Sequence, residues 1–483
     1  MHRLRIPANF VAPSGGRLKI RLHSAIQFFI RNRLSSRKSI FIYQWNNLFN
    51  MAQLESRPHS SIKIDRKENQ ENEFNSDDEI MLSYLDQAFK RLRILEAQIS
   101  NEQAEEKRSH GRLFRNNMFE DIKPEQRQHL KRIMVRALKA LGHTIHQNLK
   151  SKENKKLLCL DRKSQKNFVH DRNGVIFLKS KKHIKYCEVG QSIQGLMLHV
   201  ITKVLPLLQS DSYMTKRELY YKSKEFLQRS GCQKLHNTIT DICCLVGSSQ
   251  VHLNILSQTK GLVFGDLRYK LKSGEVFDCM SKESGTNIPT GQYPIVRLES
   301  GARFILIVEK DSVFQKILSQ EKESNFVKKY KAIIFTGKGY PDVPSRAFIH
   351  YLWSKLRVPV LALTDADPHG CEIVCCYKFG CYNTAGEQLY LALPQIRWLG
   401  LLPTDVTRLG ISVENTSSQS PTDTKKINSL LKRPYLANRP EWKQQLTHLR
   451  NSGRKAELES LDLTGSYLVR TYLPNKLRFG AWL

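Results

Sequence analysis

Three compact apolar runs in the C-terminal half constrain the fold more than any other feature of the sequence. They cover residues 304–308, 332–335 and 358–363, and helical segments separate them, including one over about 344–356. A strand covered on one face alternates apolar and polar residues, whereas an unbroken apolar run is typical of a strand covered on both faces. The alternation of such runs with helices predicts an α/β domain with a parallel sheet.

Acidic residues directly follow two of these runs. Glu309 comes after the first, and Asp365 and Asp367 come after the third. Ligands of open α/β sheets bind at the carboxyl ends of the strands, and clustered carboxylates are costly unless a divalent cation neutralises them. All-oxygen ligands favour Mg²⁺ over zinc. Asp367 has an alternative role, because Pro368 follows it and the aspartate can cap the next helix.

The second run is followed by Gly337, Lys338 and Gly339. Their backbone amides and the lysine are suited to contact a phosphate, but the Walker pattern is absent and no ATP site is evident. His369 is interpreted as a turn or phosphate contact in preference to a metal ligand.

A tyrosine pair occupies a predicted helix from Lys216 to about Arg229, which Thr215 and Glu218 would open as a capping box. At 100° per residue, the core side carries Tyr220, Ser223, Phe226 and Leu227, and the solvent side carries Arg217, Tyr221 and Lys224. A phenol among cations is suited to attack a DNA phosphodiester. An exposed tyrosine that only hydrogen-bonds a phosphate is the simpler alternative, and the helix alone does not decide.

The charge balance indicates an anionic partner. The chain holds 77 Lys and Arg against 45 Asp and Glu, a net charge of +32, which favours nucleic acid or an acidic membrane surface and argues against a neutral metabolic enzyme. A hydrophobic content of 40% excludes wholesale disorder. No apolar run approaches the roughly 18 residues that cross a bilayer, so we expect no membrane-spanning segment.

Residues 1–54 contain nine Lys and Arg and no acid. Their composition is similar to that of a mitochondrial transit peptide, but a disordered basic tail or an over-extended gene model is preferred. A helix opening at Ser76–Glu79 would carry an apolar stripe and serve docking or dimerisation; the stripe comprises Leu85, Phe89, Leu92, Leu95 and Ile99. Further helices are predicted over 124–149 and 189–209, with a Lys-rich loop over 150–166 between them.

Ten cysteines show no regular framework and are interpreted as reduced thiols of a nuclear or cytosolic protein. In the densest group, packed thiols are favoured over a zinc site, because no C-x-x-C pair is present; the group comprises Cys371, Cys375, Cys376 and Cys381.

With these motifs assembled, the sequence resembles the Spo-eleven family of meiotic double-strand-break proteins, which are relatives of the A subunit of topoisomerase VI. The resemblance runs from about residue 195 to the C-terminus. The matching motifs are residues 215–221, 261–269, 308–311, 336–339, 364–370, 396–403 and 472–480. Glu218 and Leu219 stand where Asp and Ile are commoner, and residues 1–60 match nothing in the family.

The resemblance implies a winged-helix DNA-binding domain followed by a Toprim domain. The family nucleophile is the second residue of the aromatic pair, here Tyr221, and the family arginine four residues earlier is Arg217. The family metal ligands fall on Glu309, Asp365 and Asp367, which would hold Mg²⁺. Further DNA contacts are expected from Lys216, Lys224 and Lys338.

The predicted organisation is multidomain, α/β and α+β. A disordered extension covers 1–75, a helical element and linker 76–123, the winged-helix domain 124–270, a second linker 271–300, and the Toprim domain with a helical extension 301–483.

The predicted activity is a transesterase that makes meiotic double-strand breaks in the nucleus through a 5′-phosphotyrosyl link. The resemblance implies that it acts on double-stranded DNA, without a membrane partner, as a homodimer together with other break-forming proteins and a topoisomerase VI B-like subunit. Three alternatives stay open at this point. They are the A subunit of a resealing type IIB topoisomerase with an ATP-dependent B partner, a DNA-binding scaffold with a dead site, and a metal-dependent Toprim hydrolase.

Overall fold

The structure, a computed structural model, describes residues 87, 89, 117–151, 155–161, 164–179, 185–227, 231–461 and 466–483. The predicted extension over 1–75 lies outside the described residues, as does most of the helix with the apolar stripe. Phe89 of that stripe is described: it is helical and buried, and its ring lies 5.5 Å from that of Phe304.

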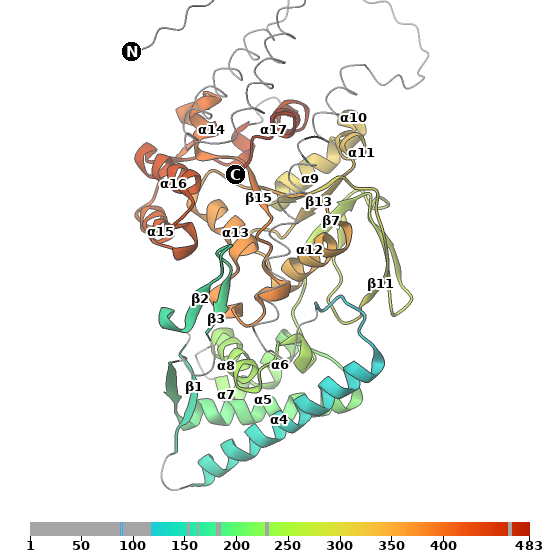
Figure 1. The fold of residues 1–483 in the computed structure, drawn as a ribbon, viewed down its shortest axis with the longest axis vertical. Coiled ribbons are helices and arrows are strands. Elements are labelled where there is room, and N and C mark those ends of the chain that lie inside the picture. The colour runs from blue at the N-terminus through green and yellow to red at the C-terminus, as the bar shows by residue number, and fades with distance from the viewer. Residues whose placement is uncertain are drawn as a thin grey trace, which may run out of the picture. The chain divides into compact units, whose positions relative to one another are not determined.

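A six-stranded mixed sheet forms the centre of the C-terminal half (Figure 1). Its strand order is β10-β7-β13-β12-β14-β15, with parallel pairing from β13 through β15 and antiparallel pairing of β7 with both β13 and β10. The three predicted strands and their parallel arrangement are confirmed. The strands are β7 (Leu262–Gly265), β10 (Thr286–Asn287), β12 (Phe304–Val308), β13 (Ala332–Thr336), β14 (Val360–Leu363) and β15 (Arg397–Gly400).

Helices cover both faces of this sheet. Side chains of β12 alternate between two cores: Ile305 and Ile307 face α12 (Val343–Leu356) and α13 (Pro368–Phe379). The other side chains of β12 pack with the opposite layer, formed by α9 (Asp311–Ser319), α11 (Phe326–Tyr330) and α17 (Leu473–Phe479). This two-sided burial explains why β12 is uniformly apolar.

A second, three-stranded antiparallel sheet has the order β11-β8-β9. Its strands are β8 (Arg268–Leu271), β9 (Val276–Asp278) and β11 (Ile295–Glu299). Strands β9 and β11 lie in the stretch 271–300 that the sequence predicted to be a linker, whereas β8 begins within the range predicted for the winged-helix domain. Strands β7 and β10 of the large sheet also precede residue 301, where the Toprim domain was predicted to begin.

The region before β7 is mainly helical, and the predicted helices over 124–149 and 189–209 are confirmed. The helices are α4 (Pro124–Lys150), α5 (Gln191–Ser210), α6 (Lys216–Lys222), α7 (Lys224–Leu227) and α8 (Gly231–Val246). Three short strand pairs accompany them: β1 (Leu157–Leu160) with β4 (Tyr186–Val189), β2 (Phe168–His170) with β3 (Ile176–Leu178), and β5 (Met214–Thr215) with β6 (Ile255–Leu256). The prediction of a loop over 150–166 is wrong where β1 pairs with β4, and the winged-helix classification stays a prediction.

Three further helices follow the large sheet: α14 (Pro403–Arg408), α15 (Pro421–Leu431) and α16 (Pro440–Ser452). A buried ion pair joins α14 to α17, because Lys476 Nζ lies 2.9 Å from Asp405 Oδ2 and the Tyr472 hydroxyl donates to the same oxygen. Within the part of the chain that the structure describes, no helix combines the length and apolar character required to cross a membrane.

Candidate functional site

The tyrosine pair lies on the short helix α6. The Thr215 hydroxyl accepts a 3.1 Å hydrogen bond from the Glu218 amide and so begins the helix as predicted. Tyr220 is half-buried against the helical core, whereas the Tyr221 side chain is 52% exposed. The prediction that the two tyrosines face different environments is confirmed.

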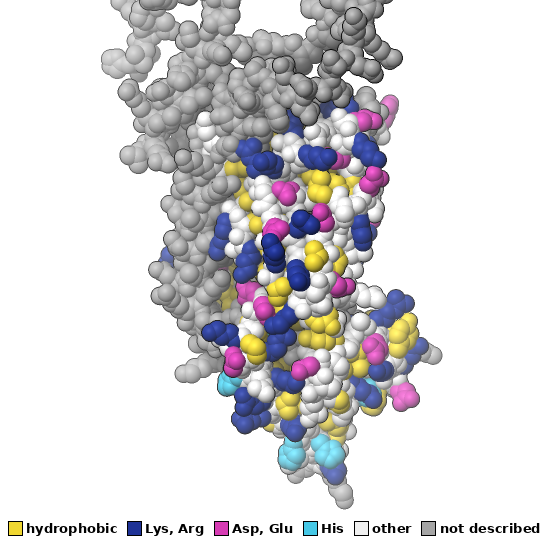
Figure 2. Space-filling model, turned by 90° about the vertical axis from the view of Figure 1, so that its right-hand side faces the viewer, with side chains coloured by type: hydrophobic (Ala, Val, Ile, Leu, Met, Phe, Trp, Pro, Cys, Tyr) yellow, Lys and Arg dark blue, Asp and Glu magenta, His cyan; other side chains and the backbone are white. Residues whose placement is uncertain are grey.

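Cations surround the exposed tyrosine. Lys224 Nζ lies 4.8 Å from the centre of the Tyr221 ring. Arg217 is exposed one helical turn before Tyr221, so both side chains leave the same face of α6. On the face drawn in Figure 2, Lys and Arg side chains are spread along the described surface with acidic side chains among them.

The predicted helix over 216–229 is wrong in its length. Helix α6 ends at Lys222, Ser223 donates its hydroxyl to the Leu219 carbonyl, and α7 begins at Lys224. Phe226, predicted on the core side, is exposed and stacks on His199 with ring centres 4.4 Å apart. Leu227, also predicted on the core side, is buried, and Lys224 is exposed as predicted, so beyond the break the helical wheel is wrong only for Phe226. Arg229 lies outside the described residues.

Lys216 occupies a different environment from its neighbours. It is half-buried, and its Nζ lies 3.5 Å from His236 Nδ1. Burial lowers its pKa, against the opposing influence of Glu387. Its proposed contact with DNA stays a prediction.

The acids of the large sheet converge at the ends of two neighbouring strands. Glu309 follows β12 and Asp365 follows β14, and β12 pairs directly with β14. The Asp365 amide donates a 2.9 Å hydrogen bond to Glu309 Oε2. Both side chains are buried, with 8% and 4% of their surface exposed. The adjacency that the strand pattern predicted is present.

Burial and mutual repulsion disfavour the charged forms of these acids. Burial, reinforced by the nearby Asp365 carboxylate, raises the pKa of Glu309 to about 8. Burial also raises the pKa of Asp365 to about 6. A cation would favour the charged forms.

Asp367 begins helix α13. Its Oδ1 accepts a 2.6 Å hydrogen bond from the Gly370 amide, and Pro368 takes the first helical position, so the predicted capping role is confirmed. The other carboxylate oxygen is not used by the cap. Position 370 requires a glycine, because two acidic residues lie close to its Cα. An added Cβ would lie 2.3 Å from the Asp365 carbonyl oxygen and 3.1 Å from Glu309 Oε2.

A lysine that the sequence motifs did not single out lies inside this acid cluster. Lys310 Nζ lies 3.0 Å from Asp365 Oδ2, 2.9 Å from Glu457 Oε2 and 3.1 Å from Glu459 Oε2. The same loop supplies the Leu458 amide, which donates a 2.8 Å hydrogen bond to Asp365 Oδ1 across a sequence separation of 93 residues. No local pattern in the sequence points to this loop.

The donor chemistry of the cluster fits Mg²⁺. Among the described residues, no group of three or more His, Cys, Asp or Glu side chains is arranged closely enough to hold a metal ion without other ligands. Mg²⁺ does not require such a group, because it keeps several waters and commonly uses one or two carboxylates. Two buried acids with raised pKa values and a third beside them satisfy that requirement.

The segment that contains Lys338 already makes contacts within the protein. The Lys338 amide donates to Thr336 Oγ1, and the Gly339 amide donates to the Glu309 carbonyl at 2.8 Å. Lys338 Nζ lies 2.9 Å from Asp311 Oδ2. Two of the backbone amides suggested for phosphate binding are therefore already engaged. His369 Nδ1 lies 3.1 Å from the Tyr340 hydroxyl, a contact that the sequence did not predict.

Comparison with protein-family models gives two matches in separate parts of the chain. The model described as the Toprim domain of the topoisomerase 6 A-subunit/Spo11 family matches residues 304–477. The model described as type IIB DNA topoisomerase matches residues 195–255. The first match contains the acid cluster and the second contains the tyrosine pair.

Individual relatives agree with the family models. The chain is 40% identical over 291 residues to the meiotic recombination protein SPO11 of Mus musculus, covering 60% of this chain and 72% of that protein. It is 31% identical to the meiotic recombination protein W68 of Drosophila melanogaster, covering 72% of this chain and 97% of the relative. It is also 31% identical to the A subunit of DNA topoisomerase 6 from Arabidopsis thaliana, covering 64% of this chain and 71% of the relative.

Proposed function

Because the chain belongs to the family of Spo11 and the topoisomerase 6 A subunit, we propose that it is a DNA transesterase that makes double-strand breaks in meiosis. The product is a protein–DNA link between a tyrosine and a 5′ phosphate. The observation that carries the proposal is the asymmetry of the tyrosine pair, in which Tyr221 is exposed beside cations and Tyr220 is half-buried.

In the proposed reaction the Tyr221 phenol oxygen attacks a backbone phosphorus. The new phosphorus–oxygen bond replaces the bond to the 3′ oxygen of the neighbouring deoxyribose, which leaves and takes up a proton as a 3′ hydroxyl. The phenol proton passes to solvent. No water is consumed, so the phosphodiester is exchanged and not hydrolysed.

Two groups of side chains support this step. Arg217, on the same face of α6, would contact the phosphate oxygens and offset the charge that develops on them. Glu309, Asp365 and Asp367 would hold Mg²⁺, which when bound supplies further positive charge to the reacting phosphate. The protein's own contribution at the cluster is to fix Glu309 and Asp365 through backbone hydrogen bonds.

One tyrosine cuts one strand, so we infer that a double-strand break requires two copies related by a two-fold axis. The family resemblance implies that the tyrosine of one copy faces the Toprim acids of the other. We therefore propose a homodimer on double-stranded DNA in the nucleus, whose partners are other break-forming proteins and a B-type subunit. The proposed unit that carries Tyr221 is a winged-helix domain, and Lys224 and Lys338 are proposed to contact the DNA.

A second candidate function is the A subunit of a topoisomerase that reseals the break. The identity to the A subunit of DNA topoisomerase 6 from Arabidopsis thaliana supports it. Both functions use the same residues, so a strand-passage assay with ATP and a B-type subunit separates them. ATP-dependent relaxation would favour the topoisomerase, and persistent covalent breaks would favour the meiotic protein.

The proposal is tested by comparing two conservative variants. Tyr221→Phe removes only the attacking oxygen and is expected to abolish covalent protein–DNA adducts while duplex affinity stays near normal. Tyr220→Phe is the matched control and is expected to retain adducts. Adducts that persist in Tyr221→Phe would refute the assignment.

A further inference from the structure

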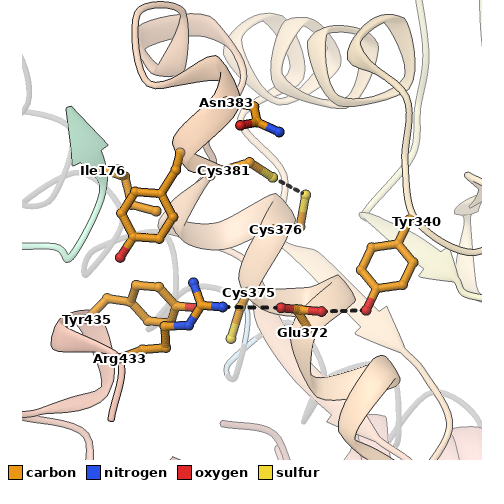
Figure 3. Close-up of a pocket in the computed structure, with 11 residues that line it drawn as sticks. Ile176, Tyr340, Glu372, Cys375, Cys376, Cys381, Asn383, Arg433 and Tyr435 are labelled. Atoms are coloured by element: carbon orange, nitrogen blue, oxygen red, sulfur yellow. Dashed lines mark hydrogen bonds and ion pairs between the residues drawn. The ribbon is translucent and has the colours of Figure 1, made fainter. Parts of the chain in front are cut away.

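Two cysteine thiols lie in direct contact at the end of helix α13. Cys376 occupies its last turn, and Cys381 follows the glycine that ends the helix. Their Sγ atoms are 2.8 Å apart (Figure 3). Both cysteines are reduced in this structure. No feature of the proposed break-forming reaction uses them.

The two thiols differ in their access to solvent. Both line a pocket of about 290 Å³, but Cys376 is buried whereas Cys381 is half-buried. Figure 3 shows Cys381 and Cys376 on one wall of this pocket, with Glu372 hydrogen-bonded to Tyr340 on another. A molecule as small as a hydroperoxide therefore has room to approach the Cys381 sulfur.

The surroundings of Cys381 favour a thiolate. Arg346 Nη1 lies 3.8 Å from Cys381 Sγ, and the Arg346 guanidinium is buried in α12. Its other hydrogen bonds go to neutral groups, Thr384 Oγ1 at 3.1 Å and Gln388 Oε1 at 2.7 Å. The fixed cation thus stabilises negative charge on the neighbouring sulfur.

The pKa values of the pair follow this arrangement. Contact with the Cys376 thiol and the charge of Arg346 lower the pKa of Cys381 to about 6, against the opposing effects of burial and of Glu372. The pKa of Cys376 is raised by its contact with the Cys381 sulfur and by its own burial. One member of the pair is suited to attack and the other to hold its proton.

We propose that Cys381 and Cys376 form a dithiol site for oxidation by hydrogen peroxide. The Cys381 thiolate attacks one peroxide oxygen, a sulfur–oxygen bond forms, the oxygen–oxygen bond breaks, and hydroxide leaves and is protonated to water. The Cys376 sulfur then attacks the sulfenic sulfur of Cys381, and a disulfide replaces the sulfur–oxygen bond. The second water takes the Cys376 proton, so two thiols are oxidised while one peroxide is reduced to two waters.

A neighbouring thiol pair supplies the matched control. Cys371 and Cys375 lie one turn apart on α13, and both are buried. Cys375 is adjacent to Cys376 in sequence but faces Cys371. Serine at Cys375 therefore changes the same helix without removing either proposed partner. Cys232 on α8 is an exposed thiol that reports non-specific oxidation.

The test treats the full-length protein with a small molar excess of hydrogen peroxide, alkylates the remaining thiols and digests with trypsin without reduction. Trypsin cleaves after Lys378, between the two cysteines, so a disulfide joins the peptides 358–378 and 379–397. We expect this linked species in the native protein and in Cys375→Ser, and its loss on reduction. We expect Cys376→Ser to accumulate a sulfenic acid at Cys381 that a dimedone probe captures.

A second measurement uses the unsubstituted protein and so does not depend on the folding of a variant. The rate of Cys381 alkylation by iodoacetamide is followed against pH and is expected to reach half of its plateau near pH 6, below the ordinary range for a thiol. The proposal is overturned if peroxide oxidises Cys232 while Cys376 and Cys381 remain open to alkylation. A linked species that survives in Cys376→Ser would also overturn it.

Discussion

The backbone amide of Asp365 donates a 2.9 Å hydrogen bond to the carboxylate of Glu309. This bond ties the ends of the neighbouring strands β12 and β14, so the two acids have a fixed separation before any cation or DNA arrives. A preorganised arrangement of this kind requires little rearrangement when charge develops on a substrate. Substitutions of residues that contact Glu309 and Asp365 test whether this arrangement depends on those contacts.

Gly370→Ala is expected to disturb the acid cluster. The added methyl would overlap the Asp365 carbonyl oxygen and press against Glu309 Oε2, and we expect a loss of about 1–3 kcal/mol in the free energy of unfolding together with loss of adducts. Gly195→Ala in helix α5 is the matched control, because nothing lies within 4 Å of its added Cβ. Urea unfolding compares the two. Equal behaviour of both variants would contradict the packing argument.

Lys310→Met is expected to make the stability of the protein depend on Mg²⁺. Without the ammonium group, Asp365, Glu457 and Glu459 lose a shared counter-charge. We expect the free energy of unfolding to fall by about 1–3 kcal/mol, which is less than for a fully buried pair because Lys310 is partly exposed to solvent. Mg²⁺ should restore more stability to this variant than to the native protein.

The control for that experiment is Lys322→Met, which removes the exposed ion pair with Glu283 and should change little. Thermal unfolding in Mg²⁺ and in EDTA measures the effect. If the gain from Mg²⁺ is the same in the native protein and in Lys310→Met, the cation and the lysine do not share the cluster.

Arg217→Ala is expected to slow adduct formation more than it weakens duplex binding. We expect the rate to fall by about 10²–10³-fold, as for other groups that stabilise developing charge. Lys222→Ala, on the same helix but paired with Glu218, is the control. Adduct rates and duplex affinities are measured at one salt concentration. An equal loss in rate and affinity would make Arg217 a plain phosphate contact.

The buried ion pair of Asp405 and Lys476 predicts a pH dependence of stability. Burial alone would raise the pKa of Asp405, but Lys476 and Arg408 hold it below its ordinary value. The two side chains of the pair are 2% and 1% exposed. At neutral pH, Asp405→Asn leaves Lys476 without its partner and should cost about 3–5 kcal/mol.

An aspartate whose pKa is lowered in the folded state stabilises the protein at pH values above its pKa in the unfolded state, which is about 3.9. This stabilisation is lost as the pH falls through the pKa of the folded state. The difference in stability between the native protein and Asp405→Asn should therefore shrink below about pH 4. Urea unfolding from pH 6 to pH 3 measures it. A difference that stays constant over this range would show that the pair is not ionised as described.

The sequence predicted the elements whose burial leaves a local signature. Strands β12, β13 and β14 are covered on both faces, so each is an unbroken apolar run. The cap of α13 was predictable because Asp367 and Pro368 are consecutive. The exposure of Tyr221 followed from helical periodicity, which holds over the single turn between Arg217 and Tyr221.

Other features had no local signature. Strand β15 begins at the polar Arg397 and is part of the sheet because it pairs with β14. The end of α6 depends on Ser223, whose hydroxyl bonds to the Leu219 carbonyl, a local competition that periodicity does not include. The contact of Lys310 with Glu459 joins residues 149 apart in sequence, so only the folded chain reveals it.

The most direct test of the account is the identity of the residue linked to DNA. The protein is recovered from meiotic cells with its covalent DNA, the DNA is trimmed with nuclease, and tryptic peptides are fragmented in a mass spectrometer. Residues 218–222 form one tryptic peptide that contains both Tyr220 and Tyr221, so fragmentation must separate them. The account predicts a 5′-nucleotide remnant on Tyr221; a remnant on Tyr220, on any other residue, or on a 3′ end would contradict it.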